Sequence, residues 1–232
     1  MTSNQSLCIS VSDTNKCPNC NSSATIKNGR TKNKKQQLVC KQCGKRFIEY
    51  YSYKAYLPRT NESIIHLTKE GLGIRSTARL LKISATTLMK RIIKIASYCR
   101  PPEMNTGKVY ELDEMKSFVK RKKTQIWIVY ALDRESKKVV SFNIGSRTSA
   151  TIKTVVNNIV TLRPASIYTD KLNIYKGLIN QNIHKTNRYG TNRIERNNLS
   201  IRTHIKRLNR KTICFSRSSV MLSAVLRIYF WS

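Results

Sequence analysis

The chain has 232 residues, and its 44 lysines and arginines outnumber its 12 aspartates and glutamates to give a formal net charge of +32. Self-repulsion on this scale is best tolerated when the partner is a polyanion. Because lysine and arginine bind nucleic acids by neutralising phosphates, we predict DNA as the partner. A basic surface that is only solvated is the alternative. An acidic membrane is disfavoured, because no long basic amphipathic helix stands out.

Neither a membrane span nor a signal sequence is expected. The longest apolar run, residues 126–132, has seven residues, whereas a bilayer span needs about 20. The amino-terminal stretch, residues 1–16, is polar and has no apolar signal core. We therefore expect a soluble intracellular protein, cytoplasmic and associated with the nucleoid.

Four of the seven cysteines form two C-x2-C pairs separated by nineteen residues. The pairs are Cys17 with Cys20 and Cys40 with Cys43. Two thiolates three residues apart can share one ion, so the two pairs predict a closed tetrahedral zinc site. Two disulfides are the alternative, from which an intracellular protein gains little. With a hairpin turn signal at Asn28 and Gly29, we predict a zinc ribbon over residues 1–55, held folded by its metal.

The next segment, from residue 61 to residue 96, has the periodicity of three short helices. Asn61 is a good N-cap for the first helix, and Ser84 caps the third after a three-residue turn. This pattern predicts a helix-turn-helix within residues 56–98, whose third helix would enter a major groove. An ordinary three-helix bundle is the alternative. The polar side of the third helix carries the expected DNA contacts: Thr86, Thr87, Lys90, Arg91 and Lys94.

Residues 99–108 are predicted to be a linker, because two consecutive prolines end the helical pattern. Beyond it, β-branched and aromatic runs predict strands, and apolar residues at helical spacing predict helices. The strands are expected at residues 108–115, 125–133, 137–145, 165–170 and 182–188, and the helices at 148–162, 171–179 and 192–208.

A meander of three strands, then helix, strand, helix, strand and helix, is the order of a ribonuclease H-like domain, which we place at residues 109–232. The basic run at residues 120–123 is expected to be a loop. The fold class predicted for the chain is therefore α+β and multi-domain: zinc ribbon, helix-turn-helix and a ribonuclease H-like α/β domain with a mixed sheet.

Three carboxylates of this last region are candidates for a metal site. Asp113 stands inside a predicted strand, where aspartate is disfavoured without a reason. Asp170 ends a strand, and ligand crevices form at such strand ends; Glu195 lies in the first turn of the last helix. Together they could bind one or two Mg²⁺ ions that clamp a phosphodiester. The basic residues expected to hold the DNA backbone beside them are Arg193, Arg196 and Arg202.

Two of these acids have a purely structural alternative. Asp170 could serve only as the N-cap of the helix that follows it. Glu195 could close a capping box on Asn192, whereas a helical ion pair is disfavoured because the residues three and four positions away are not basic.

The identity of the first carboxylate stays open on spacing alone. Asp113 has close rivals in Glu111 and Glu114, and strand alternation places Glu111 on the same face of the strand as Asp113. Asp133 and Glu135 fall in a turn and are expected to be surface residues.

Three motifs resemble the DDE catalytic domain of transposases of the insertion sequence 1 family: "LDE" at residues 112–114, "YTD" at 168–170 and "RIERNNLSIRTHIKRLNRKTICFSRS" at 193–218. The C-x2-C pairs followed by a helix-turn-helix resemble the amino-terminal half of that family. The resemblance implies a ribonuclease H-like fold, a DDE triad at Asp113, Asp170 and Glu195, and dependence on Mg²⁺ or Mn²⁺. Many members have Trp where Lys116 stands and His where Asn197 stands.

The resemblance further implies an enzyme that binds the ends of an insertion sequence, cleaves DNA there and transfers the strands to target DNA. Water, and later a 3′-OH, would attack a phosphodiester between two metal ions. We expect a homo-oligomer on double-stranded DNA, with structural Zn²⁺. The alternatives are a non-catalytic zinc-ribbon/helix-turn-helix regulator of transposition or transcription, and a nuclease acting on RNA. The predicted reader of duplex DNA disfavours the nuclease.

Overall fold

The computed structural model describes residues 16–50, 53–57, 59–103, 105–187, 189–209, 212 and 214–232. Cys8 and the other residues of the predicted zinc ribbon up to residue 15 lie outside the described residues. The chain divides into two compact units, one made of residues 1–60 and 81–83 and the other of residues 61–80 and 84–232. The finer division at residues 55, 98 and 108 stays a prediction.

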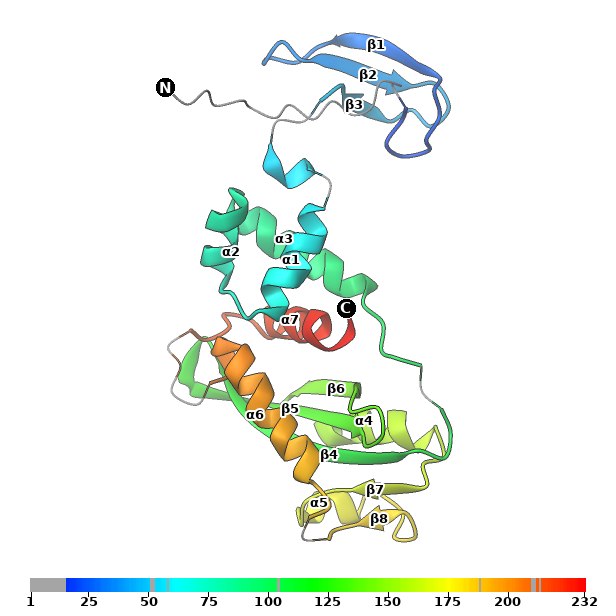
Figure 1. Ribbon diagram of the computed structural model, residues 1–232, viewed down its shortest axis with the longest axis vertical. Helices are drawn as coiled ribbons and strands as arrows, with labels where there is room; N and C mark the ends of the chain where they lie inside the picture. The colour runs from blue at the N-terminus through cyan, green and yellow to red at the C-terminus, as the bar shows by residue number, and fades with distance from the viewer. Residues whose placement is uncertain are drawn as a thin grey trace. The chain divides into compact units, whose positions relative to one another are not determined.

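The first unit contains a three-stranded antiparallel sheet in the order β1-β2-β3 (Figure 1). Its elements are β1 (Thr25–Arg30), β2 (Gln36–Cys40), β3 (Arg46–Ile48) and the 3-10 helix η1 (Lys54–Tyr56). The predicted hairpin turn at Asn28 and Gly29 is wrong. Both residues lie inside β1, where the register shifts after Lys27 and Gly29 has a φ of +73°. Glycine at positive φ suits such an irregularity, and the chain turns later, near Lys34 at φ +59°.

Three helices follow: α1 (Thr60–Lys69), α2 (Ile74–Leu81) and α3 (Ala85–Tyr98). Ser84 caps α3 as predicted, because its hydroxyl accepts the Thr87 N–H at 3.0 Å. The predicted N-cap at Asn61 is wrong. Asn61 lies inside α1, and its side-chain oxygen accepts a hydrogen bond from Arg91 of α3 at 2.7 Å. This bond ties the first helix to the third.

A five-stranded sheet in the order β6-β5-β4-β7-β8 forms the core of the remainder (Figure 1). Its strands are β4 (Val109–Val119), β5 (Arg121–Asp133), β6 (Val139–Gly145), β7 (Ser166–Tyr168) and β8 (His184–Lys185). β5 is antiparallel to β4 and β6, whereas β7 is parallel to β4 and to β8. An antiparallel meander extended on one side by parallel strands is the ribonuclease H-like arrangement, so the predicted fold class is confirmed.

Helices cover both faces of this sheet. On one face α4 (Ser149–Val160) and α5 (Asn173–Lys176) enclose a core with side chains such as Leu112, Val129 and Ile152. On the other face lies α6 (Asn192–His204), whose backbone accepts a hydrogen bond from the Tyr130 hydroxyl of β5. The 3-10 helix η2 (Lys206–Leu208) and α7 (Ser219–Trp231) follow.

The sequence analysis missed α7. Its buried residues run through most of its length: Met221, Leu222, Ala224, Val225, Leu226 and Ile228. A helix buried on several sides has no polar face, so it lacks the amphipathic period that marks a surface helix. Trp231 at its end donates from its indole N–H to the Val139 carbonyl of β6 at 2.8 Å.

The predicted basic loop at residues 120–123 is also wrong. β4 continues to Val119 and β5 begins at Arg121, so that Lys120, at a φ of +64°, makes the turn alone. Arg121, Lys122 and Lys123 belong to a strand and are exposed.

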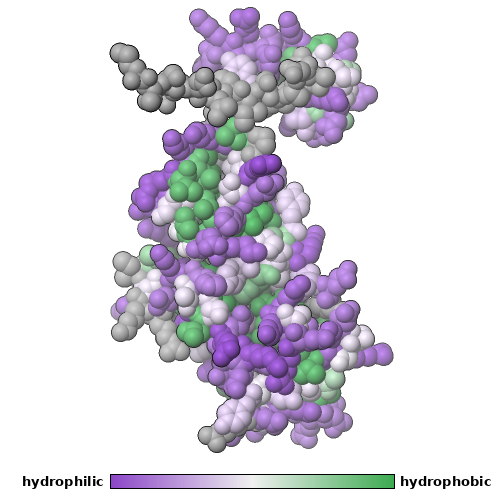
Figure 2. Space-filling model, in the orientation of Figure 1, coloured by the Kyte–Doolittle hydropathy of each residue, from purple (hydrophilic) through white to green (hydrophobic). Residues whose placement is uncertain are grey.

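Most of the surface drawn in Figure 2 is hydrophilic, in keeping with the charge of the chain. Among the helices that the structure describes, none combines the length and the apolar character that crossing a bilayer would require.

Candidate active site

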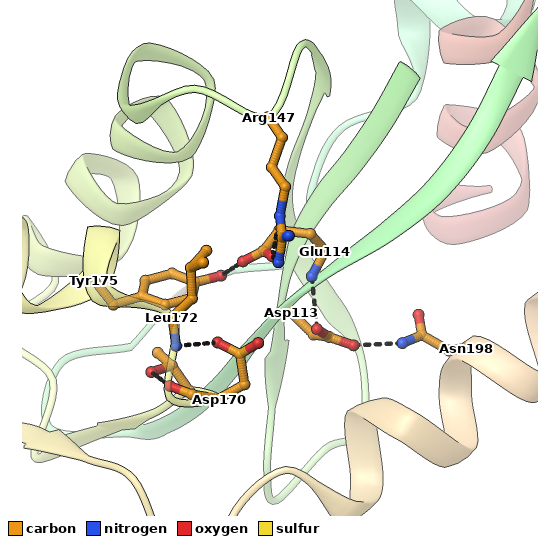
Figure 3. A network of polar contacts seen from close by, with 8 residues as sticks. Asp113, Glu114, Arg147, Asp170, Leu172, Tyr175 and Asn198 are labelled. Carbon is orange, nitrogen blue, oxygen red and sulfur yellow. Dashed lines mark hydrogen bonds and ion pairs between the residues drawn. The ribbon is translucent and has the colours of Figure 1, made fainter. Parts of the chain in front are cut away.

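Three carboxylates meet where β4 runs past the end of β7. β7 pairs with β4 only as far as Glu111, opposite Tyr168, so the edge of β4 faces the loop after β7 from there on. Carboxylate oxygens of Asp113, Glu114 and Asp170 all lie within 4.8 Å of one another (Figure 3). Hard oxygen ligands at this spacing suit Mg²⁺ or Mn²⁺. The group could therefore hold a divalent ion.

Asp113 is less exposed than Asp170, and hydrogen bonds hold both of its carboxylate oxygens. Its Oδ1 accepts the Glu114 backbone N–H at 2.8 Å, and its Oδ2 accepts the Asn198 side-chain amide of α6 at 2.6 Å. The pKa of Asp113 is raised to about 6, because burial first, and then the charges of Glu114 and Asp170, outweigh the two hydrogen bonds that lower it. A carboxylate this hard to ionise is a group that a bound cation would stabilise.

Asp170 is exposed and is placed by its own backbone turn. Its Oδ1 accepts the Leu172 N–H at 3.0 Å. The residue before it, Thr169, is buried and shares a hydrogen bond of 2.8 Å with His184 of β8. The N-cap position of α5 belongs to Leu172, so Asp170 supports the turn that leads to that helix without being its N-cap.

Glu114 is engaged by two other side chains. Its Oε2 lies 3.0 Å from Arg147 Nη2, and its Oε1 accepts the Tyr175 hydroxyl in a short hydrogen bond. Burial, followed by the charge of Glu114, raises the pKa of Tyr175, so this phenol stays protonated and donates. Arg147 in turn lies over the Trp127 ring at 4.5 Å. Glu114 thus carries a charge that the protein already neutralises.

Glu195 is exposed in the first turn of α6 and is not a member of the group that the described residues bring within 4.8 Å. It accepts the Thr191 hydroxyl at 2.9 Å. Asn192 is the first residue of α6 and Thr191 is the N-cap of that helix, so the capping box on Asn192, weighed as the alternative role of Glu195, is not formed. Glu195 lies one turn before Asn198, the residue that contacts Asp113, on the same side of the helix.

Glu111, the other rival weighed for the first carboxylate, has a structural role. It is fully buried and accepts the Ile194 backbone N–H of α6 at 2.9 Å. Arg134 Nε lies 2.8 Å from its Oε1, an ion pair by distance without hydrogen-bond alignment. As strand alternation predicted, Glu111 and Asp113 both face α6.

The prediction that Asp133 is a surface residue is wrong. Asp133 is 7% exposed and closes the turn between β5 and β6. Its carboxylate accepts the Glu135 N–H at 3.0 Å and the Ser136 hydroxyl at 2.8 Å. An aspartate that bonds the backbone two residues ahead is a common turn device. Glu135 is exposed as expected, with its side chain paired to Lys108.

The basic residues predicted to hold DNA differ in how far they are engaged. Arg196 is exposed, whereas Arg193 lies 3.7 Å from Glu111. Arg202 donates to the backbone carbonyls of Leu208 and Lys116, so it fixes the end of α6. On α3, the exposed members of the predicted set are Thr86, Lys90 and Lys94, while Thr87 belongs to the cap and Arg91 bonds Asn61.

The four predicted metal-binding cysteines form a second group. Their sulfurs lie within 4.8 Å of one another, with 3.5 Å from Cys17 to Cys43 and from Cys20 to Cys40. Tetrahedral zinc with Zn–S bonds of about 2.3 Å places sulfurs roughly 3.8 Å apart. The Lys45 backbone N–H lowers the pKa of Cys43 to about 6, which favours the thiolate that a metal needs. The site fits a tetrahedral, thiolate-bound ion.

Both knuckles of this group share one backbone geometry. The Asn21 N–H bonds the Cys17 carbonyl at 2.9 Å, and the Gly44 N–H bonds the Cys40 carbonyl at 3.0 Å. Both turn residues have positive φ, +55° and +68°. Glycine and asparagine are the residues that tolerate this conformation best.

Sequence reasoning missed the groups that surround Asp113. Asn198 could have been found from its place one turn after Glu195. Nothing in the sequence pointed to Tyr175 or Arg147, because their contact with Glu114 depends on how α5 and the loop before α4 fold onto the sheet.

Comparisons with known proteins match two segments of the chain. The family model described as "IS1 transposase" matches residues 108–231, and the one described as "InsA C-terminal domain" matches residues 51–95. "Insertion element iso-IS1n protein InsB" of Shigella dysenteriae is 40% identical over 110 residues, 47% of this chain and 84% of the relative. "Insertion element IS1 protein InsB" of Shigella flexneri is 34% identical over 119 residues, 51% and 91%.

Among solved structures, the HTLV-2 integrase catalytic core domain in complex with magnesium is similar over 52% of this chain and 84% of that chain, with 16% identity and a TM-score of 0.37.

Removing one thiolate should unfold the first unit alone. We expect the purified protein to hold one tightly bound zinc ion per chain, and Cys40→Ser should abolish it by removing a ligand. The first unit should then unfold, because a small unit with little core depends on its metal. Zinc content by elemental analysis and limited proteolysis would show the loss, with the second unit still resistant. Cys214→Ser, at an exposed cysteine, is the control. A Cys40→Ser chain that keeps full zinc content would contradict the site.

The raised pKa of Asp113 should appear in the stability of the chain without Mg²⁺ or Mn²⁺. Well above pH 6 the carboxyl is ionised in both the folded and the unfolded state, so the cost of burying it is fully present. This cost is lost as the pH falls through about 6, and it is absent well below pH 4, where the carboxyl is protonated in both states. Asp113→Asn should therefore raise the free energy of unfolding by about 1–2 kcal/mol at pH 7.5, and the difference should fade as the pH drops. Urea unfolding of the zinc-loaded chain, without added Mg²⁺ or Mn²⁺, would measure it. A gain that is equal at all pH values would contradict burial as the cause.

Proposed function

Because the chain belongs to the IS1 transposase family, we propose that Asp113, Asp170 and Glu195 are the carboxylates with which it cleaves and joins DNA. The enzyme is a DDE-type DNA transposase. The observation that carries the residue assignment is the approach of Asp113 and Asp170 at the open edge of β4, directly beneath α6. Cleavage at the element's ends and strand transfer into target DNA are the two reactions proposed for this site.

Glu195 is a better third carboxylate than Glu114. Arg147 and Tyr175 occupy both oxygens of Glu114, so a metal ion would have to displace a cation and a buried phenol. Glu195 is exposed, and the group that donates to it is the neutral hydroxyl of Thr191. Two hydrogen bonds hold α6 against β4 on either side of Glu195: Ile194, the residue before it, bonds Glu111, and Asn198, three residues after it, bonds Asp113. Turning the Glu195 side chain to another rotamer costs less than breaking a buried ion pair.

We propose a separate role for each residue of the site in metal binding, positioning and phosphate contact. Mg²⁺ or Mn²⁺, when bound, would polarise the scissile phosphate and activate the attacking oxygen. Asp113 and Asp170 would provide the fixed ligands, because hydrogen bonds hold both carboxylates in place. Glu114 would fix the backbone of β4 beside Asp113, and Arg196 would contact a phosphate next to the cleaved bond.

The helix-turn-helix and the cysteine group complete the proposal. The family match over residues 51–95 implies DNA binding, and we assign to Thr86, Lys90 and Lys94 the contacts with the element's ends. We further propose structural Zn²⁺ at the four cysteines, a homo-oligomer on DNA, action in the cytoplasm on nucleoid DNA, and domains divided at residues 55, 98 and 108. The transposase match covers residues 108–231, so the non-catalytic regulator weighed from the sequence is not carried forward.

Neutralising Glu195 should stop the chemistry and leave binding intact. Glu195→Gln should lower Mg²⁺-dependent cleavage of end-bearing duplexes by about 10³-fold or more, because a metal ligand contributes several kcal/mol to transition-state stabilisation. Gel-resolved cleavage and filter binding would be measured on the same DNA. Glu103→Gln, which removes an exposed glutamate of the linker, should be silent.

The opposite pattern would identify a different ligand set. If Glu195→Gln cleaves at the wild-type rate while Glu114→Gln is inactive and folded, the third carboxylate is Glu114 and the proposed triad is wrong.

If α3 reads bases, removing one of its contacts should lower the affinity for the element's own ends more than the affinity for random DNA. Lys90→Ala should weaken binding to those ends about tenfold more than binding to random duplex, if this exposed lysine contacts base edges. Competition binding at fixed salt would measure both affinities. Lys153→Ala, at an exposed lysine of α4, controls for the loss of one charge. Equal losses on both DNAs would mean that Lys90 contacts phosphates alone.

A further inference from the structure

The hairpin of β4 and β5 extends beyond the rest of its sheet as a two-stranded ribbon. β6 pairs with β5 only from Trp127 onward, and β7 pairs with β4 only up to Glu111. The hairpin continues past both through the pairs Ser117 with Ile126 and Phe118 with Gln125. We call residues 117–126 the basic ribbon (Figure 1).

The tip of the basic ribbon is strongly cationic. Its four consecutive basic residues are all exposed: Lys120, Arg121, Lys122 and Lys123. Because successive strand residues point to opposite faces, Arg121 and Lys123 share one face and Lys122 takes the other. None of the ion pairs found in the described part of the chain involves these residues. Their charge is therefore available to an outside partner.

The ribbon is braced and not a loose tail. The Lys120 N–H donates to the Ser216 carbonyl at 2.9 Å, and Val119 forms a parallel bridge with Ser216. The Phe118 and Phe215 rings meet edge to face with centroids 5.8 Å apart. Val119 and Ser216 are buried. A braced cationic ribbon loses little conformational freedom when it binds, which favours affinity.

The ribbon also lies in line with the carboxylates. Asp113 and Val119 are on the same strand, six residues apart, which is roughly 20 Å at about 3.3 Å per residue. A hollow of about 380 Å³ lies along this path, and its lining includes Glu114, Lys116 and Phe118. Twenty ångströms of B-form DNA is about six base pairs.

We propose that the basic ribbon binds the phosphate backbone of duplex DNA about six base pairs from the phosphodiester that the site cleaves. The proposal rests on the proposed function, because the carboxylates define the cleavage point. The ribbon serves as a contact without sequence preference, separate from the reading helix α3. It would hold one arm of the duplex along β4 and so align the strand with Asp113 and Asp170.

The test uses the full chain and end-bearing duplexes shortened in steps from either side of the cleavage point. Binding is measured on the zinc-loaded chain without added Mg²⁺ or Mn²⁺, for the wild type and for the triple variant Arg121→Gln, Lys122→Gln, Lys123→Gln. On long duplexes the variant should bind about tenfold or more weakly, and its salt dependence should fall by about 2–3 in log–log slope, since each phosphate contact contributes about 0.9. Once one arm is shorter than about six base pairs, the two proteins should bind equally.

Two further variants serve as controls. Lys137→Gln, Lys138→Gln, Lys153→Gln removes three exposed lysines elsewhere in the same unit and should show no dependence on arm length. Arg121→Lys keeps the charge and should bind like the wild type, which would show that the ribbon acts through its charge and not through the guanidinium group of Arg121.

The proposal would be overturned if the triple ribbon variant binds no more weakly than the triple lysine control. It would also be overturned if the ribbon variant loses the same affinity on every duplex, whatever the arm length. Mg²⁺-dependent cleavage by the wild type is recorded on the same duplexes. Cleavage without a ribbon effect would contradict the ribbon alone, whereas absence of wild-type cleavage would contradict the proposed function.

Discussion

Glu111 accepts the backbone N–H of Ile194, 83 residues away, and so fastens the start of α6 to the middle of β4. The carboxylate is fully buried and pairs with Arg134, which itself stacks on the Tyr168 ring at 4.2 Å. Removing one partner of a buried ion pair costs about 3–5 kcal/mol. This anchor brings Asn198 against Asp113 and puts Glu195 on the turn between them. The candidate site depends on it, because the two elements that form the site come from opposite ends of the domain.

The strand that carries this anchor concentrates three of the chain's 12 acids within four residues, and each does different work. Glu111 binds the start of α6, Asp113 accepts a hydrogen bond from Asn198 of the same helix, and Glu114 is neutralised by Arg147. β7 pairs with β4 only as far as Glu111, which leaves the edge of β4 open beside Asp113 and Glu114. In a protein of net charge +32, a small acidic centre surrounded by cations suits a polyanionic substrate that must be brought to metal ions.

The sequence predicted most elements of the sheet because their periodicity is local, and it predicted the cysteine group because C-x2-C spacing fixes the geometry. The predictions from the sequence were wrong where the same residue type occurs in more than one kind of local structure. The Asn28–Gly29 pair made a strand irregularity in place of a turn, and the basic run at residues 120–123 continued as a strand although charge suggested a loop. Asp133 became a buried turn cap and Asn61 a contact between helices. The roles of Glu111 and Glu114 depend on Arg134 and Arg147, partners that are distant in the chain.

In the proposed site, Asp113, Asp170 and Glu195 hold the catalytic metal ions, and Glu114 stays paired with Arg147. Anomalous diffraction from crystals of the full chain soaked in Mn²⁺ tests it most directly, because it locates the ions and their ligands without reference to activity. The account predicts Mn²⁺ bound by Asp113 and Asp170, with the Glu195 carboxylate turned in to bind the same ion or one about 3.5–4 Å from it. Mn²⁺ bound by Glu114, with Arg147 displaced and Glu195 still on Thr191, would contradict it.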